Sequence, residues 1–416
     1  MNITDEEALE YHIGGKLSTN ITKKCENQRD LSLAYTPGVA VPCLHINKDK
    51  KLAYKYTTKA NTVAVISNGT AVLGLGDLGA IASKPVMEGK VVLFKKFAKL
   101  DGVDIEVDET DPQKIIDVCR AIAPTFGGIN LEDIKAPECF FIEQELQKIV
   151  DIPIMHDDQH GTAIITSAGL INACELVNKP IDKIKVVISG SGAAAMSCAN
   201  MYQRLGVKNI IMTDSKGVLN HKRDDLNKYK KKFAIDTTCE TLSDAMKGAD
   251  MFLGLSAAKI VSKDMVKSMA NKPIIFALSN PTPEILPKDI KAVRDDAIIA
   301  TGRSDYVNQV NNVLGFPFIF RGALDVQATK ITENMKLEAC YALASIAKDP
   351  VPQYVKDIYN NQDMHFGKDY IIPTPFNKEN LIQVSSAVAL AAFEDGVSGL
   401  DSFDITKYKE QLRNLL

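Results

Sequence analysis

The stretch KIKVVISGSGAAAMSCANMYQRLGV (residues 183–207) decides the fold of this chain. It opens with a run of β-branched residues, Val186–Ile188, turns at two glycines and continues into an alanine-rich segment that suits a helix. The turn Gly190-Ser191-Gly192-Ala193-Ala194-Ala195 matches the pattern G-x-G-x-x-G/A, with alanine in the last place. Gly190 permits the tight turn, and Gly192 lets the backbone approach a pyrophosphate at the helix N-terminus. This strand–turn–helix context predicts a dinucleotide-binding unit.

Short apolar runs alternate with helix-forming stretches along most of the chain, a rhythm typical of a parallel α/β protein. At 416 residues the chain exceeds the size at which single hydrophobic cores usually divide. We therefore expect an α/β fold of two domains, bridged by the amphipathic stretch 161–177. They are an N-terminal α/β domain at 1–160 and a Rossmann-type, doubly wound parallel sheet at 161–390, with a C-terminal helical tail at 391–416. The predicted strands are 62–67, 104–107, 128–131, 152–155, 183–190, 209–213, 251–255, 273–278 and 297–300, and the first domain's predicted helices are 85–100, 112–123 and 139–150.

The composition excludes several classes of protein. Lys and Arg number 49 against 52 Asp and Glu, so the net charge of −3 gives no support for a nucleic-acid or acidic-membrane partner. No apolar run approaches a membrane-spanning length, and the acidic, polar start MNITDEEALEYHIGG does not suit a signal peptide. The eight cysteines are scattered without a C-x-x-C pair, so reduced thiols are expected rather than a zinc or disulfide framework. These features indicate a cytoplasmic protein of enzyme size.

The second predicted strand of the Rossmann-type sheet ends at Asp214, 22 residues beyond Gly192. An acidic side chain there accepts hydrogen bonds from the adenosine ribose and repels a 2′-phosphate, which favours NAD. Lys216 lies two residues further on and leaves NADP open. Ser256 and Asn280 follow two later strands and are also assigned to the cofactor. The lysine-rich segment HKRDDLNKYKKKF (221–233) is interpreted as a solvated helix face.

Two acidic pairs follow neighbouring strands of the first predicted domain. Glu132-Asp133 comes directly after strand 128–131, and Asp157-Asp158 comes after strand 152–155. If these strands are parallel and adjacent, both pairs emerge at the carboxyl edge, where ligand sites of open α/β sheets occur. Four carboxylates gathered there repel one another unless a cation neutralises them, and Mg²⁺ or Mn²⁺ suits an all-oxygen set. The plainer alternative for any single acid is that it caps the following helix.

The segment His156-Asp157-Asp158-Gln159-His160 carries the i, i+4 histidine spacing of H-E-x-x-H zinc hydrolases. In that motif both histidines lie on one helix and glutamate follows the first. Here aspartate takes that place, and the preceding IPIM predicts a strand rather than a helix. Partly buried, hydrogen-bonded histidines are therefore favoured over zinc ligands.

Several segments together resemble the malic enzyme family, in its short bacterial and archaeal form, over nearly the whole chain. The most specific are VLGLGDLG (72–79) followed by MEGK (87–90), NLEDI (130–134) and HDDQHGTA (156–163). The others are LAYTPGVA (33–40), DIEVDETD (104–111), LSNPTPE (278–284), ATGRSDY (300–306) and VNNVLGFPFIFRGALD (310–325).

The resemblance implies roles for individual residues. Tyr35 resembles the family's catalytic tyrosine and Lys90 its catalytic lysine, and Asp157 matches an acid that supports proton transfer. Larger members of the family carry arginine where Ala71 stands, so part of the grip on the substrate carboxylate is unassigned, with Lys84 and Arg303 as candidates. By the same resemblance, Glu132, Asp133 and Asp158 are the metal ligands, and Asn280 and Asn312 bind the substrate carboxylate.

The activity implied by the resemblance is the oxidative decarboxylation of L-malate to pyruvate and CO₂, with reduction of NAD or NADP and a requirement for Mg²⁺ or Mn²⁺. The family also implies a homodimer, in some members with an active site completed by the partner subunit. An oxaloacetate decarboxylase of the same family is the nearest alternative. A zinc hydrolase would use His156 and His160 as ligands. An amino-acid dehydrogenase would share the two-domain layout and a catalytic lysine but would not need the acidic cluster. A non-catalytic nucleotide sensor would not need Tyr35, Lys90 and the acids together.

Overall fold

The computed structural model describes residues 3–72 and 74–416, so Leu73 of the VLGLGDLG block and the first two residues of the predicted N-terminal domain lie outside it. The first sheet contains four parallel strands in the order β2-β1-β3-β4. They are β1 (Thr62–Ser67), β2 (Asp101–Glu106), β3 (Gly128–Leu131) and β4 (Ile154–His156), connected by α5 (Ala80–Ala98), α6 (Pro112–Ile122) and α7 (Glu138–Ile149). β2 is added on one side of β1, and β3 and β4 on the other, so the strand order switches between β1 and β3. Ligand sites of open α/β sheets occur at the carboxyl edge of such a switch point.

The second sheet has the strand order β10-β9-β8-β5-β6-β7, with β7 alone antiparallel. Its strands are β5 (Lys185–Ser189), β6 (Asn209–Asp214), β7 (Gly217–Val218), β8 (Met251–Gly254), β9 (Ile274–Ala277) and β10 (Ile298–Thr301). The helices between them are α9 (Ala193–Arg204), α10 (Leu242–Met246), α11 (Lys263–Lys267) and α12 (Pro287–Lys291). This order is that of a doubly wound dinucleotide fold with its reversal between β5 and β8, so the predicted α/β, Rossmann-type class is confirmed.

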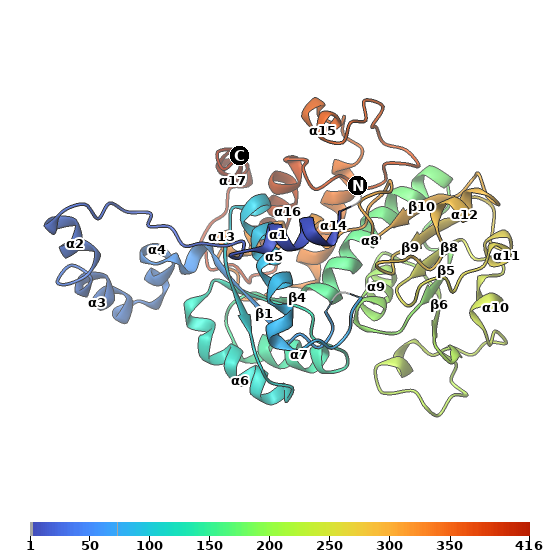
Figure 1. The fold of residues 1–416 in the computed structure, drawn as a ribbon, viewed down its shortest axis with the longest axis horizontal. Coiled ribbons are helices and arrows are strands. Elements are labelled where there is room, and N and C mark those ends of the chain that lie inside the picture. Colours follow the sequence, from blue (N-terminus) through green and yellow to red (C-terminus); the bar gives the residue numbers. More distant parts are fainter. Residues whose placement is uncertain (1–2, 73) are drawn as a thin grey trace.

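One helix, α8 (Asp157–Val177), connects the two sheets and is buried along most of its length (Figure 1). After β10 the chain forms α13 (Phe316–Asp325), α14 (Glu333–Ile346), α15 (Gln353–Ile358), α16 (Ser385–Glu394) and α17 (Ile405–Arg413). Phe316 and Phe320 of α13 pack edge-to-face on Phe94 of α5, so this late segment returns to the first sheet. The division predicted at 160/161 falls inside α8, and the predicted domain limits stay a prediction. Short 3₁₀ turns lie at Lys50–Leu52, Thr58–Asn61, Ala123–Thr125, Lys230–Phe233 and Asn312–Leu314, with a π-helical turn at Asn380–Val384.

The N-terminal segment behaves differently from the rest. It forms α1 (Asp5–His12), α2 (Gln28–Ala34), α3 (Ala40–Lys48) and α4 (Ala53–Tyr56), and no residue from Ile3 to Asn61 is buried. Lys16 ties α1 to α5 through its backbone amide, which donates to Glu88, and its ammonium, which donates to the carbonyl of Pro85. The part that follows, residues 21–56, projects away from the body (Figure 1). We call it the projecting arm.

Most predicted elements of the two sheets form where the sequence indicates, with boundary shifts. The strand expected at 104–107 occupies 101–106, and the helix expected from 161 begins at Asp157. The interpretation of 221–233 as a helix face is wrong, because this segment is a loop that ends in the 3₁₀ turn at Lys230–Phe233. All eight cysteines are free thiols, as expected, and no described helix is both long and apolar enough to cross a membrane.

Candidate active site

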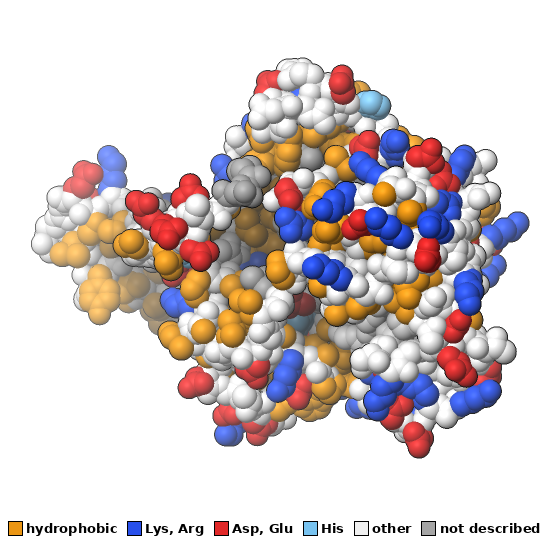
Figure 2. Space-filling view, turned by 45° about the vertical axis from the view of Figure 1, so that its right-hand side comes forward, with side chains coloured by type: hydrophobic (Ala, Val, Ile, Leu, Met, Phe, Trp, Pro, Cys, Tyr) orange, Lys and Arg blue, Asp and Glu red, His pale blue; other side chains and the backbone are white. Residues whose placement is uncertain are grey.

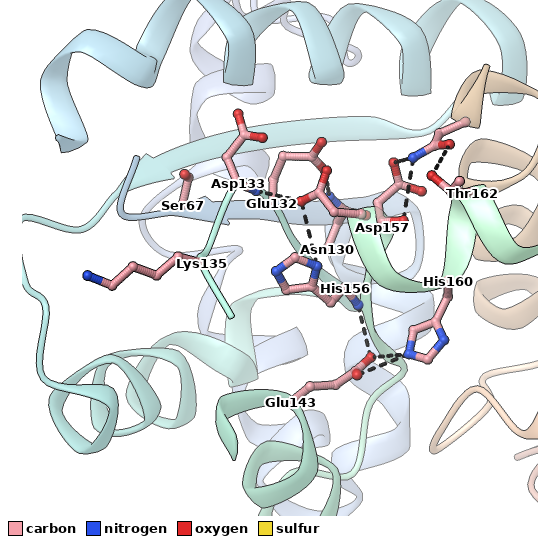
Figure 3. A network of polar contacts seen from close by, with 12 residues as sticks. Ser67, Asn130, Glu132, Asp133, Lys135, Glu143, His156, Asp157, His160 and Thr162 are labelled. Atoms are coloured by element: carbon pink, nitrogen blue, oxygen red, sulfur yellow. Dashed lines mark hydrogen bonds and ion pairs between the residues drawn. The ribbon is translucent and has the colours of Figure 1, made fainter. Parts of the chain in front are cut away.

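Three predicted metal ligands converge at the carboxyl edge of the first sheet. Glu132 and Asp133 directly follow β3, and Asp158 stands in the first turn of α8, which follows β4 without a loop. Because β3 and β4 are parallel neighbours, the structure brings one carboxylate oxygen of each acid within 4.8 Å of the others. Figure 3 shows Glu132 and Asp133 above the end of the sheet, beside Asp157. Asp133 adopts a left-handed backbone (φ 52°), and its amide donates to Asp158 Oδ2 at 2.8 Å.

The residues of this cluster fit a divalent cation. All three donors are carboxylates, the hard oxygen ligands that Mg²⁺ and Mn²⁺ take. Burial raises the pKa of Glu132 well above its ordinary value; the ammonium of Lys90 opposes this rise, and the charges of Asp158, Asp157 and Asp133 add to it. A dication would remove the repulsion that these shifts record.

Lys90 extends from α5 into the acids, as its predicted role requires. Its side chain is 10% exposed, and its ammonium lies 2.6 Å from Asp157 Oδ2 and 2.8 Å from Glu132 Oε1. The ammonium also sits 4.1 Å from the centre of the Phe316 ring. Burial lowers the pKa of Lys90, but the charges of Asp157, Glu132 and Asp158 outweigh it and raise the pKa above the ordinary value. Lys90 is therefore an ammonium held at the cluster by charge.

Asp157, which follows β4 of the first sheet, contacts a residue that follows the second sheet. The side-chain amide of Asn312, which follows β10, donates to Asp157 Oδ2 at 3.0 Å and accepts from Thr162 at 3.1 Å. Asp157 Oδ1 is buried against Gly161 and has no hydrogen-bond partner among the described residues. Gly161 makes this approach possible, because a Cβ there would clash with Asp157 and lie 2.9 Å from Cγ of Asn312.

A second polar network lies beneath the acids (Figure 3). Glu143 of α7 is buried, and it accepts from the backbone amide of His156 at 2.9 Å and from Nε2 of His160 at 3.0 Å. Lys336 of α14 contacts Nδ1 of His160 at 3.2 Å. Burial raises the pKa of Glu143, but His160 and Lys336 outweigh it and bring the pKa to about 2. His156 ends β4 while His160 lies on α8, so the H-x-x-x-H spacing forms no helical zinc pair. The expectation of hydrogen-bonded histidines is confirmed for His160, whose ring contacts Glu143 and Lys336. It is wrong for the ring of His156, whose two nitrogens are buried and have no hydrogen-bond partner among the described residues.

Sequence reasoning missed Glu143, although a signal was present. Cys139, Ile142 and Leu146 form the apolar face of the predicted helix 139–150, and Glu143 falls on that same face. An acid among buried apolar positions requires a partner, and the HDDQH segment supplies two, the backbone amide of His156 and the ring of His160.

The remaining predicted substrate and catalytic residues lie apart from the acids or are already engaged. Tyr35 ends α2 in the projecting arm and is 70% exposed, so the chain does not bring it to Lys90. Asn280 lies against Gly302, where an added Cβ would come 2.8 Å from its Nδ2. Lys84 pairs with Asp104 at 2.6 Å, and Arg303 pairs with Asp305 at 2.7 Å and donates to the Pro281 carbonyl at 2.9 Å.

The predicted dinucleotide turn forms at the reversal point of the second sheet. Gly190 has φ +118°, and a Cβ there would clash with the Leu255 carbonyl, so glycine is required. Gly192 is the N-cap of α9 and no side chain caps the helix, which leaves its first amides available to an anion. Ala195 is buried in the first turn of α9. Ser256 lies next to this turn, with its hydroxyl 2.9 Å from that of Ser189.

The carboxylate of Asp214 is expected to be free to bind a ribose, but both of its oxygens already accept hydrogen bonds. Arg223 donates to both of its oxygens at 2.8 and 3.0 Å, and Lys230 donates to Oδ2 at 2.7 Å. The backbone amide of Lys216 occupies Oδ1 as well, at 3.0 Å. Burial raises the pKa of Asp214, but the hydrogen bonds from Arg223 and Lys230 outweigh it and lower the pKa to about 2. The loop interpreted as a solvated helix thus supplies two cations to this carboxylate.

Comparison with known proteins agrees with this architecture. Residues 14–116 match the family described as "Malic enzyme, N-terminal domain", and residues 159–360 match "Malic enzyme, NAD binding domain". The "Probable NADP-dependent malic enzyme" of Rickettsia prowazekii is 56% identical over 99% of this chain and 54% of that protein. The "NADP-dependent malic enzyme" of Halomonas elongata is 54% identical over 94% of both chains. The crystal structure of a malic enzyme from Pyrococcus horikoshii superposes with a TM-score of 0.89 at 39% identity, over 99% of this chain and 95% of that one.

The chain spans about half the length of several of the curated relatives it matches, the R. prowazekii protein among them. It spans nearly all of the H. elongata enzyme and of the P. horikoshii structure. These matches, together with the two sheets and the acids at the edge of the first, show that the chain belongs to the malic enzyme family.

Proposed function

We propose that this protein catalyses the oxidative decarboxylation of L-malate to pyruvate and CO₂, with reduction of NAD(P) and a requirement for Mg²⁺ or Mn²⁺. The observation that carries the proposal is the buried ammonium of Lys90, 2.6 Å from Asp157 and 2.8 Å from Glu132, beside three carboxylates suited to a cation. The names printed for relatives in R. prowazekii and H. elongata agree with it.

In this proposal Glu132, Asp133 and Asp158 hold the cation, and the glycine turn before α9 holds the dinucleotide. When bound, the cation would polarise the C2 oxygen of malate and stabilise charge during loss of CO₂, and the dinucleotide would accept the hydride.

The chain's own residues manage the protons. Lys90 takes the proton of the C2 hydroxyl, and it can do so once its own proton has passed to Asp157, 2.6 Å away. Asn312 holds Asp157 in position through its hydrogen bond to Oδ2. Loss of CO₂ from C4 leaves a carbanion-like C3 that must be protonated, and Tyr35 is the proposed acid, with Lys90 returning its proton.

The decisive experiment follows the absorbance of reduced nicotinamide with malate and Mn²⁺, in parallel with NAD and NADP. Steady-state reduction of either cofactor, with pyruvate formed in equal amount, is the expected result. Release of CO₂ from oxaloacetate without any reduction from malate would instead favour the oxaloacetate decarboxylase. Bound zinc and hydrolase activity would contradict both.

We propose further that NADP is the preferred cofactor, contrary to the preference for NAD drawn from Asp214 alone. The Asp214 oxygens already accept from Arg223, Lys230 and the Lys216 amide, which leaves little capacity for a ribose diol. Asp214 and Asp225 carry two negative charges, against three positive charges on Arg223, Lys216 and Lys230, which pair with them. A net positive group at the end of the second Rossmann strand suits a 2′-phosphate.

The ratio of kcat/KM for NADP to that for NAD tests this preference. Arg223→Gln should lower the ratio by about tenfold, since a hydrogen bond to a charged group contributes about 1.5–3 kcal/mol. Arg294→Gln is the matched control, because Arg294 pairs with Asp296 at 2.8 Å through a similar fork beside β10. A wild-type ratio below one, or an equal change in the control, would refute the assignment.

The position of Tyr35 supports a homodimer whose active sites combine both subunits. The projecting arm exposes eight large hydrophobic side chains, an unusual concentration for a free surface (Figure 2). A second copy of the chain is the partner that would both cover this surface and bring Tyr35 to the Lys90 of its neighbour. The eight residues are Ile21, Leu31, Leu33, Tyr35, Val39, Val41, Leu44 and Tyr56.

Mixing two inactive variants tests this arrangement. Tyr35→Phe and Lys90→Ala should each be inactive as homodimers, yet refolding them together should restore activity in about a quarter of all sites. Recovery is expected because each mixed dimer contains one site with both residues intact. No recovery, in a mixture shown by mass to contain mixed dimers, would indicate that Tyr35 acts within its own chain or not at all.

We also propose domain limits at 1–160, 161–390 and 391–416 and a cytoplasmic location. In the same way we assign Ser256 to the cofactor, and Asn280 to the cofactor and the substrate.

A further inference from the structure

We propose that Glu143 is a positioning residue for the metal site: its carboxylate grips both ends of the segment that carries Asp157 and Asp158. The inference rests on the proposed metal-dependent function. Glu143 itself touches neither the proposed ligands nor Lys90, and it acts through His156 and His160.

The first contact fixes the end of β4. This strand lies at the edge of the first sheet, and among the described residues no further strand pairs with its outer side. The buried backbone amide of His156 points to that outer side and donates to Glu143 Oε1 at 2.9 Å. Without this acceptor a buried amide would lose its only partner, which is costly in an apolar setting.

The second contact fixes the first turn of α8. Nε2 of His160 lies 3.0 Å from the same carboxylate. The ammonium of Lys336 is a donor only, so Nδ1 of His160 accepts from it at 3.2 Å and Nε2 carries the proton. His160 therefore donates to Glu143, and Lys336, which also pairs with Glu333, sets its tautomer.

These two contacts lie on either side of the segment that carries Asp157 and Asp158. His156 and His160 flank Asp157, Asp158 and Gln159, so one carboxylate holds the segment at both of its ends. Asp157 and Asp158 lie close to like charges and would relax apart if the segment were free to move. Glu143 lies below the acids, beside His160, and resists that movement from there (Figure 3).

A buried acid could serve stability alone, so the test separates metal affinity from folding. Mn²⁺ binding to the full chain, freed of metal, is measured by titration calorimetry for wild type and Glu143→Gln, together with the thermal midpoint. Glutamine can satisfy only one of the two donors. Asp250→Asn is the matched control, because Asp250 likewise accepts from a strand amide, Lys185, at 2.8 Å and from a lysine, Lys179, at 2.7 Å, at the amino edge of the other sheet.

Glu143→Gln should weaken Mn²⁺ binding by about tenfold or more, the usual effect of losing a residue that orients metal ligands. Saturating Mn²⁺ should restore most of kcat in the NADP-linked assay. Asp250→Asn should lower the thermal midpoint and leave Mn²⁺ affinity unchanged. Unchanged affinity in Glu143→Gln, or equal weakening in Asp250→Asn, would overturn the inference.

His160→Ala decides the matter if Glu143→Gln does not fold. It removes one contact and leaves the His156 amide paired, so it should fold and weaken Mn²⁺ binding by a smaller factor than the loss of both contacts. Wild-type affinity in His160→Ala would overturn the inference. A wild-type protein that neither binds Mn²⁺ nor reduces NADP from malate would overturn the proposed function first, whereas a normal wild type with an unaffected Glu143→Gln would overturn only the role of Glu143.

Discussion

Replacing Lys90 by methionine removes the one cation that the described chain places among the acids. Lys90 pairs with Asp157 and Glu132, and all three side chains are nearly buried. Removing one partner of such a group typically costs about 3–5 kcal/mol, because a buried charge is left uncompensated. Glu132 can take up a proton instead, since its pKa is already raised by burial, so we expect a loss near the lower limit, about 3 kcal/mol. Methionine keeps the aliphatic packing of the side chain.

Thermal unfolding of the metal-free protein measures this loss. About 3 kcal/mol corresponds to a fall in Tm of about 6–12 °C for a domain of about 150–250 residues. Mn²⁺ should raise the Tm of Lys90→Met more than that of wild type, because the dication then replaces the missing charge. Malate oxidation should fall by at least about a hundredfold while dinucleotide binding survives. Lys179→Met removes a partly exposed pair with Asp250 and is the control. A metal-free variant as stable as wild type, or an equal Mn²⁺ shift in both, would refute the reasoning.

Three further outcomes follow from the same geometry. Asp158→Ala should weaken Mn²⁺ binding sharply in calorimetry, since it removes one of three converging carboxylates, and an unchanged affinity would count against the ligand set. Gly161→Ala should reduce kcat at least about tenfold in a folded protein, because its Cβ would displace Asp157 and Asn312 from each other; near-normal turnover would show that the contact is dispensable. Asp214 has a pKa of about 2 in the folded chain, below the ordinary 3.8, so its ion pairs stabilise the fold above about pH 4 and lose this effect as the pH falls. Asp214→Asn should therefore lower Tm at pH 7, with a difference from wild type that shrinks below about pH 4, and a constant difference would contradict the lowered pKa.

The parts of the site that the sequence predicts well are those fixed by one regular element. Glu132 and Asp158 lie within two residues of the ends of β3 and β4, and the parallel pairing of these strands brings them to one edge. Gly190 and Gly192 are likewise fixed by the strand and helix they connect. In each case an apolar strand marks the position, and the rule that ligands lie at the carboxyl edge supplies the rest.

The parts that escaped prediction depend on contacts between distant segments. Arg223 and Lys230 reach Asp214 only because the loop after β7 folds back over the end of β6, and the lysine pattern alone resembles a solvated helix. The surface on which Tyr35 packs is a different case. Its motif is specific, but no pattern in the sequence tells whether a surface helix packs on its own chain or on another. The pattern of charge and hydrophobicity along the chain predicts neither the contact of the loop with Asp214 nor the packing partner of the Tyr35 helix.

The connection between the two sheets fixes the acids relative to the dinucleotide turn. β4 runs into α8 without a loop, so Asp157 and Asp158 have no flexible connection through which they could drift. The same helix continues between the sheets and packs along α9, whose N-terminus carries Gly192. Asn312 then returns from the end of the second sheet to bind Asp157 at 3.0 Å. The proposed hydride transfer would require the C2 carbon of malate and the acceptor to be held within about 3–3.5 Å. Helix α8 begins at the acids and lies along α9, the helix of the dinucleotide turn. The contact from Asn312 to Asp157 provides a second connection between the two sheets. This arrangement meets the distance requirement more directly than two domains joined by a flexible linker would.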